Sequence, residues 1–419
     1  MDVGEEGRTI RPRTGGARVG EGDPAGATWP PIAFEEHPWE LDPGVSLSRR
    51  RLRAACGPYT AAVPPSIAPL DVVLPSGIAA EAEDAARLLT RFDAEVGRLP
   101  APLSSILLRT ESASSSEVEH ITASARQIAL AELNVSASSN ARLVVANTRA
   151  MEAALRLADR MDRAAILDMH AALLGESQPS IVGRWRDQQV WVGGGSESPH
   201  LAQFVPPHHD RVPDLMADLE EFVARADVPS IAHIAIAHAQ FETVHPFPDG
   251  NGRTGRALAQ AMLRAEGLAT QVTVPVSAGL LGDLDGYVRA LNAYREGDLV
   301  PIVQAFVDSV FRALANGQRL ADDLAALETE WSARVRARAN SAASRLGRVL
   351  QSHPVLSVEV AAAELGVGFQ AANAAIAQYE AAGVVRLMKQ QRRNRLWQVP
   401  EVLGALDAFA ERARRGRVA

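Results

Sequence analysis

Apolar residues recur at helical spacing through most of residues 77–328. The pattern is clear in EAEDAARLLTRFDAEV, RLVVANTRAMEAALRLA and PSIAHIAIAHAQFETV, where apolar side chains return every three or four positions. Such spacing places them on one face of an α-helix, and several helices can bury these faces against one another. The sequence therefore predicts a mainly α fold, a helical bundle.

The helical pattern stops between residues 183 and 215. A β-branched and aromatic run, QVWV, is followed there by consecutive glycines and later by FVPP. This composition is typical of a β-hairpin or an ordered loop between helices. We therefore expect a small β-hairpin flap in this part of the chain.

A different order of elements follows residue 335. SRLGRVLQSHP, SVEVAAAELGVG and FQAANAAIAQYEAAG each predict a helix, and VVRLMKQQRRNRLWQVP predicts a strand, a basic turn and a second strand. Helix, helix-turn-helix and hairpin in this order are typical of a winged helix. Residues 335–419 are therefore predicted to be a C-terminal winged helix-turn-helix domain.

The length of 419 residues predicts two or three domains. We expect residues 1–35, which are rich in glycine, proline, arginine and glutamate, to be disordered. Residues 36–160 are expected to form an N-terminal helical region, and residues 161–330 the helical core that carries the loop described below.

Charge and cysteine content narrow the class of protein. The net charge of −7, from 43 Lys and Arg against 50 Asp and Glu, argues against a nucleic-acid coat protein. Cys56 is the only cysteine, which excludes an intramolecular disulfide and a cysteine-rich zinc site. No apolar run reaches the roughly 18 residues of a membrane span, and the N-terminus lacks a secretory pattern. We expect a cytoplasmic protein with no membrane partner.

The stretch HPFPDGNGRTGR, residues 245–256, joins two of the predicted helices. Proline ends the first helix near His245, and Arg253 begins the second after a glycine-rich run. The simplest interpretation is an Asx-Gly turn between helices. A turn alone does not account for Arg253 and Arg256, which stand on one face of the first helical turn, against the helix dipole.

The residue types in this loop describe a nucleotide-triphosphate site. Glycines that lead into a helix N-terminus direct backbone N–H groups at phosphate, and a bound polyanion would explain Arg253 and Arg256. Asp249 is a hard oxygen ligand suited to Mg²⁺ beside phosphates. His245 titrates near neutrality and suits a general base. The sequence has no GxxxxGK[ST] loop and no kinase signature, so the common ATP-binding folds are excluded as alternative interpretations.

The loop resembles the signature of the Fic (Fido) family, H-x-F-x-[DE]-G-N-G-R-x-x-R, at every fixed position. The resemblance extends to AHAQFE before the motif, to GRWR and the flap, and to the proline connector after Tyr59. It implies a Fic-type helical bundle and an enzyme, a protein adenylyltransferase. Such an enzyme transfers AMP from ATP to a Ser, Thr or Tyr hydroxyl of a target protein or of itself.

The same resemblance implies a role for each residue of the motif. Family members that phosphorylate carry lysine at the position of Gly252, so glycine here favours AMP transfer. The implied roles are general base for His245, core anchor for Phe247, Mg²⁺ ligand for Asp249, anion hole for Gly250, Asn251 and Gly252, phosphate and transition-state contact for Arg253, and γ-phosphate contact for Arg256.

SSSEVEH, residues 114–120, carries a second candidate feature. Taken alone it predicts the start of a helix, with serines that cap and acids in the first turn. It also resembles the inhibitory motif of the family, [ST]-x-x-x-E-[GN], with Ser115 and Glu119 in place and His120 at the position of the usual Gly or Asn. The resemblance implies an inhibitory helix near residues 114–128, in which Glu119 pairs with Arg256 and blocks the γ-phosphate. In some relatives this glutamate assists AMP removal, so deAMPylation is a further expectation.

The flap carries two alternatives. The resemblance implies that Val190, Trp191 and Val192 clamp the target segment as an added strand. The other interpretation is that Trp185 and Trp191 are simply core residues.

The C-terminal domain also allows more than one partner. A basic cluster on the expected wing would contact DNA phosphates, although the candidate recognition helix carries no arginine or lysine. Protein docking and a homodimer are the other expectations. The alternative function is a winged-helix transcriptional regulator or docking protein that uses the Fic core as a nucleotide sensor; another donor nucleotide, such as UTP, is a third possibility. The basic cluster consists of Arg386, Lys389, Arg392, Arg393 and Arg395.

Overall fold

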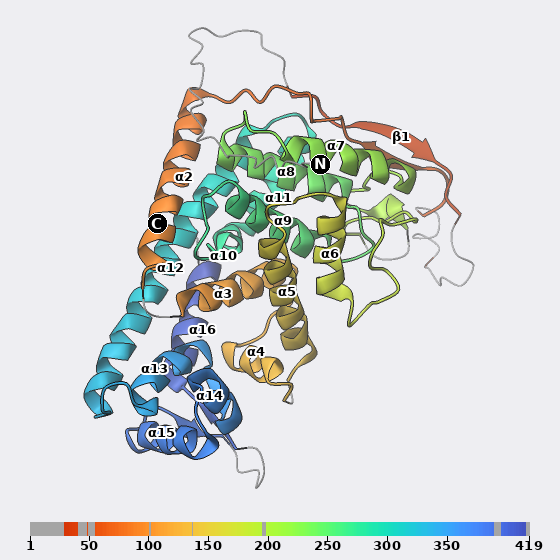
Figure 1. The fold of residues 1–419 in the computed structure, drawn as a ribbon. Coiled ribbons are helices and arrows are strands. Elements are labelled where there is room, and N and C mark those ends of the chain that lie inside the picture. Colours follow the sequence, from red (N-terminus) through yellow and green to blue (C-terminus); the bar gives the residue numbers. More distant parts are fainter. Residues whose placement is uncertain are drawn as a thin grey trace, which may run out of the picture.

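The computed structural model describes residues 29–40, 48, 55–99, 102–135, 137–194, 198–388 and 395–415. The fold is mainly α-helical, as the sequence predicts (Figure 1). The larger part of the molecule is built from helices α2 (Ser76–Val96), α3 (Leu103–Val118), α4 (Ala125–Glu132), α5 (Ser139–Arg156), α6 (Arg163–Leu174), α7 (Val212–Val223), α8 (Ser230–Val244), α9 (Asn251–Ala265), α10 (Val276–Leu281), α11 (Leu284–Arg295) and α12 (Val300–Arg334), with short 3₁₀ turns η1 (Pro199–Leu201) and η2 (His209–Arg211).

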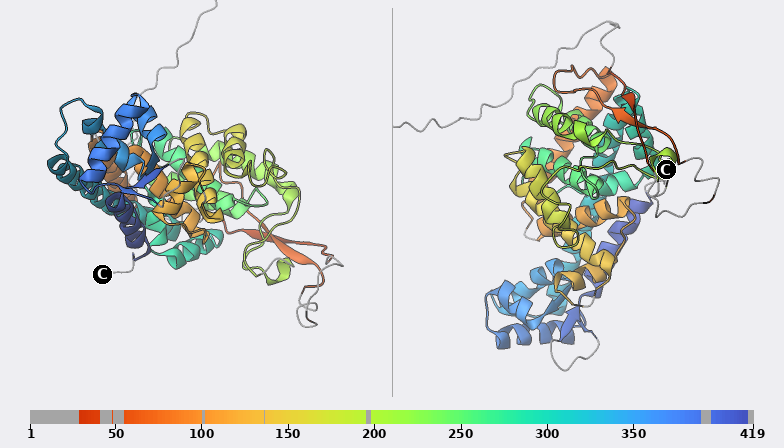
Figure 2. Two further views of the ribbon diagram at one scale, coloured as in Figure 1. Left: turned by 90° about the horizontal axis from the view of Figure 1, so that it is seen from below. Right: turned by 90° about the vertical axis from the view of Figure 1, so that its right-hand side faces the viewer.

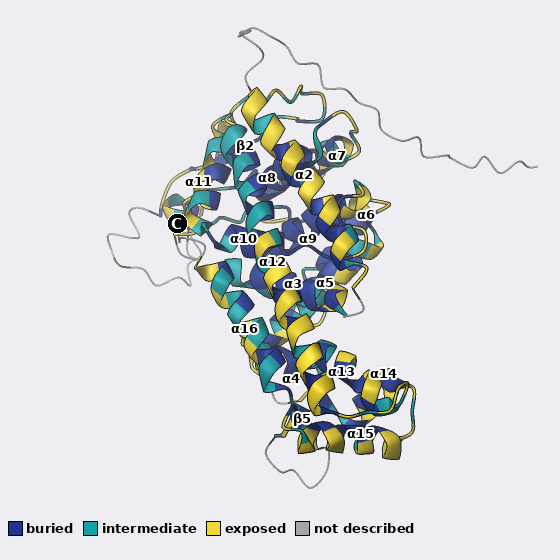
Figure 3. Ribbon diagram, turned by 90° about the vertical axis from the view of Figure 1, so that its left-hand side faces the viewer, coloured by how far each residue is buried: buried dark blue, intermediate teal, exposed yellow. Residues whose placement is uncertain are grey.

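Helix α8 is the centre of this bundle because its sequence is apolar on nearly all sides. Every residue from Ile231 to Val244 is buried. The helix packs against α2, α7, α9, α11 and α12. The outer helices α2 and α12 each show an exposed stripe and a buried one (Figure 3), as an amphipathic pattern requires. The helices that carry the glycine-rich loop, α8 and α9, are therefore the most deeply buried part of the fold.

The N-terminal segment is ordered from the first described residue. The buried Trp29 packs against Tyr294, with ring centroids 6.1 Å apart. Strand β1 (Ala33–His37) then pairs antiparallel with β2 (Tyr59–Val63) in a ribbon at the edge of the molecule (Figure 1). The predicted disorder is therefore wrong for residues 29–35, because a distant aromatic partner orders them; the residues before them lie outside the described part.

The helices and strands predicted after residue 335 are present and lie at one end of the molecule (Figure 2), whereas the predicted basic turn, residues 389–394, lies outside the described part. Among the described residues no single helix is long and apolar enough to cross a membrane, and Val358–Leu365 with Phe369–Ala381 meets that standard only as a pair bent by 108°. We call these elements the C-terminal unit: α13 (Ala342–Ser352), α14 (Val358–Leu365), α15 (Phe369–Ala381) and an antiparallel sheet in the order β3 (Val355–Ser357), β5 (Leu396–Gln398), β4 (Arg386–Leu387).

The last helix, α16 (Pro400–Arg414), is not anticipated by the sequence analysis. It leaves the C-terminal unit and packs back against α3, α4, α10 and α12. Its buried side chains include Val402, Leu403 and Phe409. The C-terminal unit is thereby connected to the helix that carries Ser115 and Glu119.

Candidate active site

The loop between α8 and α9 is shaped by two left-handed residues. His245 caps α8 with a φ of 51°, and Gly250 precedes α9 with a φ of 78°. A side chain at Gly250 would approach Leu173 and Leu174 to 3.0 and 3.1 Å, so both leucines would have to shift, and the positive φ would be strained for any other residue. The amide of Asn251 closes the loop, because it accepts from the backbone N–H of Phe247 and donates to its carbonyl, each at 2.8 Å. The side chain of Asn251 therefore supports the loop, and only its backbone remains for an anion.

Phe247 anchors the loop to the core. Its ring is fully buried and stacks on His170 with centroids 3.7 Å apart and planes 3° from parallel. The His170 Nε2 lies 3.0 Å from the Asp249 carbonyl oxygen. Trp185, which is 7 % exposed, packs against Phe247 from another direction at 5.3 Å. Of the two interpretations of Trp185, the core residue is the one the structure supports.

Arg186 holds the His245 end of the loop, a contact that residue patterns did not reveal. Its Nε donates to the His245 carbonyl at 2.9 Å, and its Nη2 donates to the Pro207 carbonyl at 2.5 Å. Burial lowers the pKa of this guanidinium to about 10, so it remains charged at neutral pH. Only the GRWR resemblance pointed to this position. Arg186 therefore ties the base of the flap to the residue predicted to act as the base.

Arg253 and Arg256 converge on one carboxylate. Arg253 Nε donates to Glu119 Oε2 at 2.6 Å, and Arg256 Nη2 donates to Glu119 Oε1 at 2.9 Å. Both arginines are 3 % exposed. Burial alone would lower the pKa of Arg256, but Glu119, Tyr287 and Glu242 together outweigh it and raise the pKa. The resemblance implied a pair between Glu119 and Arg256 alone; the structure divides the two oxygens between both arginines.

Gly252 makes this approach possible. A Cβ at Gly252 would lie 2.5 Å from Glu119 Oε1 and 2.8 Å from Arg256 Nη1. Any larger residue would therefore displace the carboxylate from the first turn of α9. The absence of a side chain at Gly252 therefore determines how closely Glu119 reaches the arginines.

Residues 114–118 form the end of α3, not the start of a helix as composition predicted. Ser115 is fully buried, and Arg256 donates to both its hydroxyl oxygen, at 2.9 Å, and its carbonyl, at 2.7 Å. Ser116 donates back to the Ser112 carbonyl at 2.9 Å. A serine can cap the start of a helix, and inside a helix its hydroxyl can donate to a carbonyl of the preceding turn. Here the hydrogen bonds from the buried Arg256 fix Ser115 inside the helix. The expected inhibitory helix near residues 114–128 thus comprises the last turn of α3, a loop and the start of α4.

His120 adopts the left-handed backbone conformation for which the resembled motif usually has glycine or asparagine. Its φ is 62°, the left-handed conformation of a residue just past a helix end. The N–H groups of His120 and Ile121 donate to the carbonyls of Glu117 and Ser116 at 2.8 and 3.0 Å, the two bonds of a Schellman motif. The departure from the family pattern therefore leaves the helix end intact and keeps Glu119 at the arginines.

Asp249 lies at the open edge of the site. Its Oδ2 accepts from Gln178 Nε2 at 2.6 Å, its Oδ1 accepts from the Gly250 N–H at 2.6 Å, and its side chain is 47 % exposed. Arg253 Nη2 lies 3.6 Å from Oδ1. A hard, exposed and oriented carboxylate beside two arginines fits a Mg²⁺ ion that also binds phosphate oxygens. Gln178 is a supporting residue that no sequence signal identified.

The imidazole of His245 is neutral. Burial, followed by the positive charge of Arg186, lowers the pKa of His245 to about 3, so the prediction that this residue titrates near neutrality is wrong. Its Nδ1 lies 3.9 Å from Glu242 Oε2. Burial raises the pKa of Glu242 to about 7. A neutral imidazole can accept a proton, as a general base must.

The flap is less regular than predicted. Among the described residues it contains one antiparallel bridge, Val192 with Phe204, and residues 195–197 lie outside the described part. Val190, Trp191 and Val192 are each partly buried. Trp39 packs edge-on against Trp191, with centroids 5.5 Å apart. The clamping role of these three residues stays a prediction.

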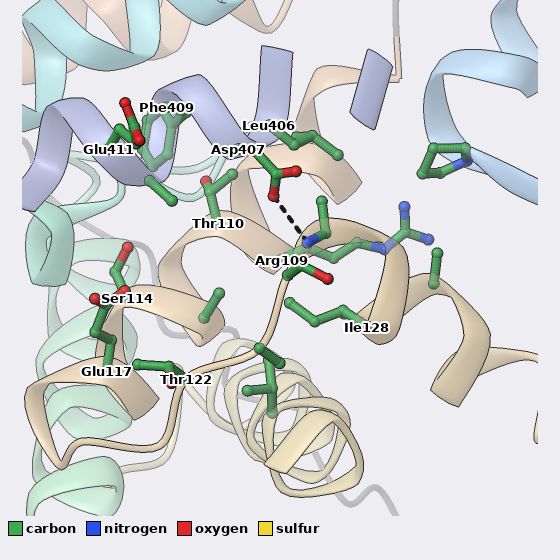
Figure 4. A pocket seen from close by; sticks show the side chains of 18 of the residues that line it. Arg109, Thr110, Ser114, Glu117, Thr122, Ile128, Leu406, Asp407, Phe409 and Glu411 are labelled. Atoms are coloured by element: carbon green, nitrogen blue, oxygen red, sulfur yellow. Dashed lines mark hydrogen bonds between the residues drawn. The ribbon is translucent and has the colours of Figure 1, made fainter. Parts of the chain in front are cut away.

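A cavity of about 490 Å³ lies beside α3, between α3, α4 and α16 (Figure 4). Thr110, Ser114 and Glu117 line it from α3, and Leu406 and Phe409 from α16. Glu117 accepts from Arg414 of α16, with Arg414 Nη2 at 3.1 Å from Glu117 Oε2. Helix α3 is therefore held at the arginines by Ser115 and Glu119, and at α16 by Glu117.

Comparison with known proteins agrees with this geometry. Residues 160–263 match the Fic/DOC family. The chain is similar to protein adenylyltransferase fic-1 of Caenorhabditis elegans, 32 % identical over 165 residues that cover 36 % of this chain and 30 % of that protein. It is also similar to protein adenylyltransferase Fic of Nematostella vectensis, 31 % identical over 143 residues that cover 33 % of this chain and 30 % of that protein. The chain thus spans about a third or less of the length of these curated relatives.

Solved structures of the same kind are more distant. A Fic family protein from Desulfovibrio desulfuricans aligns over 78 % of this chain and 97 % of its own, at 21 % identity and a TM-score of 0.49. The matched family range contains His245, Asp249, Arg253 and Arg256, and falls almost wholly inside the predicted core of residues 161–330. The chain therefore carries a Fic/DOC-family domain, which spans residues 160–263.

Proposed function

We propose that this chain is an autoinhibited protein adenylyltransferase, which transfers AMP from ATP to a Ser, Thr or Tyr hydroxyl of a target protein or of itself. One observation carries the proposal. Two buried arginines, Arg253 and Arg256, converge beside a glycine-rich helix N-terminus that lies next to a neutral histidine. Two buried positive charges are stable side by side only when an anion binds both of them. The polyphosphate of a nucleotide is an anion of the right chemistry for this place.

The proposed reaction is an in-line displacement at the α-phosphorus of ATP. His245 accepts the proton of the target hydroxyl as its oxygen forms the new P–O bond. The bond from the α-phosphorus to the bridging oxygen breaks, and pyrophosphate leaves. Arg253 and the backbone N–H groups of the first turn of α9 stabilise the charge that builds on the phosphate oxygens. Arg186 positions His245 through its carbonyl.

Mg²⁺ is the implied cofactor, and Asp249 is the residue that would hold it. When bound, the ion would neutralise phosphate charge and orient the leaving group. Gln178 and the Gly250 N–H fix the carboxylate that would bind the ion. The fit rests on a hard oxygen ligand that already lies beside the phosphate-binding arginines.

Transfer of AMP is distinguished from phosphorylation by the position of the label. In a lysate, we expect a Glu119→Gly protein to add label from α-labelled ATP, and none from γ-labelled ATP beyond that of the lysate alone, because only the AMP portion remains on the product. The measurement is gel autoradiography of both reactions with and without the added protein, with EDTA as the metal-free control. Added γ label above the lysate alone would show a kinase instead, and added label from α-labelled UTP alone would show a different donor.

Autoinhibition by Glu119 is supported by the site that it occupies. Its carboxylate satisfies both arginines that a triphosphate needs, and it comes from α3, outside the matched Fic range. A nucleotide can bind its γ-phosphate only where this carboxylate has moved away. We infer that activity is low while α3 keeps its present position. Assistance of AMP removal by the same glutamate remains an expectation.

Arg414→Ala should weaken this inhibition. The pair between Arg414 and Glu117 holds the last turn of α3, and the Arg414 side chain is 47 % exposed. An ion pair of this exposure contributes roughly 0.5–1 kcal/mol, so AMP transfer should rise about two- to fivefold. The measurement is the initial rate of α-label incorporation in the full-length variant.

Two controls separate this effect from a general loosening of the fold. Arg415→Ala removes the neighbouring pair with Glu411 on the same helix and should leave the rate unchanged. In a Glu119→Gly background Arg414→Ala should add nothing, since no carboxylate remains to be released. Equal stimulation by Arg415→Ala, or an additive effect in the Glu119→Gly background, would remove Arg414 from the inhibition.

The C-terminal unit is proposed to be a winged-helix domain that contacts DNA or docks a protein partner. Of the five residues of the basic cluster, Arg386 and Arg395 are described. Arg395 donates to Asn373 at 3.2 Å, and its guanidinium lies 5.1 Å from the Trp397 ring. Lys389, Arg392 and Arg393 lie outside the described residues. DNA binding, a homodimer, the nucleotide-sensor alternative and the cytoplasmic location stay predictions.

A further inference from the structure

Three consecutive polar residues just before α7 form a cluster outside the loop from His245 to Arg256. We call His208, His209 and Asp210 the histidine–aspartate cluster; they lie in and beside η2. The His208 Nδ1 is 3.3 Å from Asp210 Oδ2, and the His209 Nε2 is 3.5 Å from Asp210 Oδ1. One potential ligand atom from each residue lies within 4.8 Å of the other two. The cluster shares no residue with the loop that runs from His245 to Arg256.

The two imidazoles approach opposite oxygens of one carboxylate: His208 Nδ1 faces Oδ2, and His209 Nε2 faces Oδ1. With metal–nitrogen distances of about 2.0–2.1 Å and metal–oxygen distances of about 2.0–2.2 Å, ligands at neighbouring tetrahedral corners lie roughly 3.3–3.5 Å apart. The three ligand atoms already lie within 4.8 Å of one another, so small side-chain rotations would bring them to those separations.

Ring stacking orients the imidazoles of the cluster. His37 at the end of β1 stacks on His208 with ring centroids 4.2 Å apart, and the His208 and His209 rings are 4.0 Å apart. These contacts limit the rotation of the rings whose nitrogens would bind the metal ion.

Space for a further ligand adjoins the cluster. A cavity of about 410 Å³ is lined by Glu35, His37, His208, Asp210 and Asp214, among others. Three protein ligands with one position left for water or an incoming ligand are the pattern of an open metal site. The cavity supplies that fourth position.

We propose that His208, His209 and Asp210 bind one divalent transition-metal ion of the Zn²⁺ class. Two imidazoles and one carboxylate suit Zn²⁺, Co²⁺ or Ni²⁺, whereas Mg²⁺ prefers an all-oxygen site such as that of Asp249. The ion would fix the segment that follows Pro207, whose carbonyl accepts from Arg186. The metal would thereby stabilise the base of the flap without taking part in AMP transfer.

The test measures Zn²⁺ binding to the tag-free chain by isothermal titration calorimetry, at neutral pH and in excess Mg²⁺. We expect one Zn²⁺ per chain and a higher Tm when Zn²⁺ is added. His209→Gln and Asp210→Asn should each weaken Zn²⁺ binding about tenfold or more and abolish the Tm increase. Two substitutions that remove different ligands protect the test against a variant that fails to fold.

Two matched variants define the site. His353→Gln, in the C-terminal unit, removes a partly exposed histidine that also lies beside an acid, Glu364, and should bind Zn²⁺ as the wild type does. Asp249→Asn should also bind it unchanged, since the proposed ion is separate from the nucleotide-associated Mg²⁺. The proposal is overturned if wild-type protein binds no Zn²⁺, if the His209 and Asp210 variants keep wild-type affinity, or if Asp249→Asn loses it.

Discussion

Replacement of Glu119 by glycine should raise AMP transfer about 10- to 100-fold. Glu119 accepts one hydrogen bond from Arg253 at 2.6 Å and one from Arg256 at 2.9 Å. Hydrogen bonds to charged groups contribute roughly 1.5–3 kcal/mol, and every 1.4 kcal/mol corresponds to about tenfold in competition with a nucleotide. The measurement is the initial rate of incorporation from α-labelled ATP, for self-modification and for lysate targets.

The same substitution should lower stability until a nucleotide is added. Without Glu119 the two arginines, each 3 % exposed, are left without their carboxylate. An uncompensated buried charge is strongly destabilising, so the Tm of the nucleotide-free variant should fall. Saturating ATP with Mg²⁺ should then raise the Tm of the variant more than that of the wild type, because phosphates replace the lost carboxylate. A lower Tm without nucleotide, together with a larger Tm increase on addition of ATP, is expected only if Glu119 and the nucleotide compete for the two arginines.

His120→Gly is the matched control for the helix end. It relieves the left-handed conformation at a φ of 62° but leaves Glu119 in place. The variant should keep wild-type activity and gain slightly in stability. If Glu119→Gly labels no more strongly than the wild type, or if His120→Gly activates equally, inhibition by the carboxylate is wrong.

The catalytic loop could be predicted because its determinants are local. Proline and glycine determine where α8 ends and α9 begins, and these positions bring His245, Asp249, Arg253 and Arg256 into one short segment. Their chemical types then limit what the segment can bind. The helical bundle could be predicted for the same reason, since amphipathic spacing is a property of each segment.

The contacts that support the site could not be predicted, because they join distant segments. Arg186 reaches the carbonyl of His245, 59 residues away, and Glu119 reaches Arg253, 134 residues away. Ser115 was assigned to a helix start because a capping serine and a buried serine have the same sequence signal. No local pattern in residues 400–414 indicates that α16 returns to α3. The resemblance to a family indicated some of these long-range contacts, such as that of Glu119 with Arg256. The residue patterns alone indicated none of them.

His245→Ala should reduce AMP transfer by roughly 10²- to 10⁴-fold while nucleotide affinity stays within about twofold, the range for loss of a general base. His245 binds no phosphate in the proposed mechanism, so its removal affects the proton transfer alone. The measurements are transfer rate and ATP affinity in the Glu119→Gly background, where the arginines are free for the nucleotide.

The left-handed backbone of His245 requires a second variant. At a φ of 51° alanine is strained, so a loss of activity in His245→Ala could come from a displaced loop. Asparagine tolerates this conformation and cannot act as a base at neutral pH, so His245→Asn should show the same loss with an intact loop. Because burial and Arg186 lower the pKa of His245 to about 3, the imidazole stays unprotonated as the pH falls through 6.5, the ordinary value for histidine. His245 should therefore add no step to the rate of the Glu119→Gly protein at that pH; a step from Glu242, whose pKa burial raises to about 7, should disappear in a Glu242→Gln variant. Full transfer activity in His245→Asn would exclude the imidazole as the base, and a rate that halves near pH 6.5 in the Glu242→Gln variant would show that the imidazole titrates as an exposed histidine does.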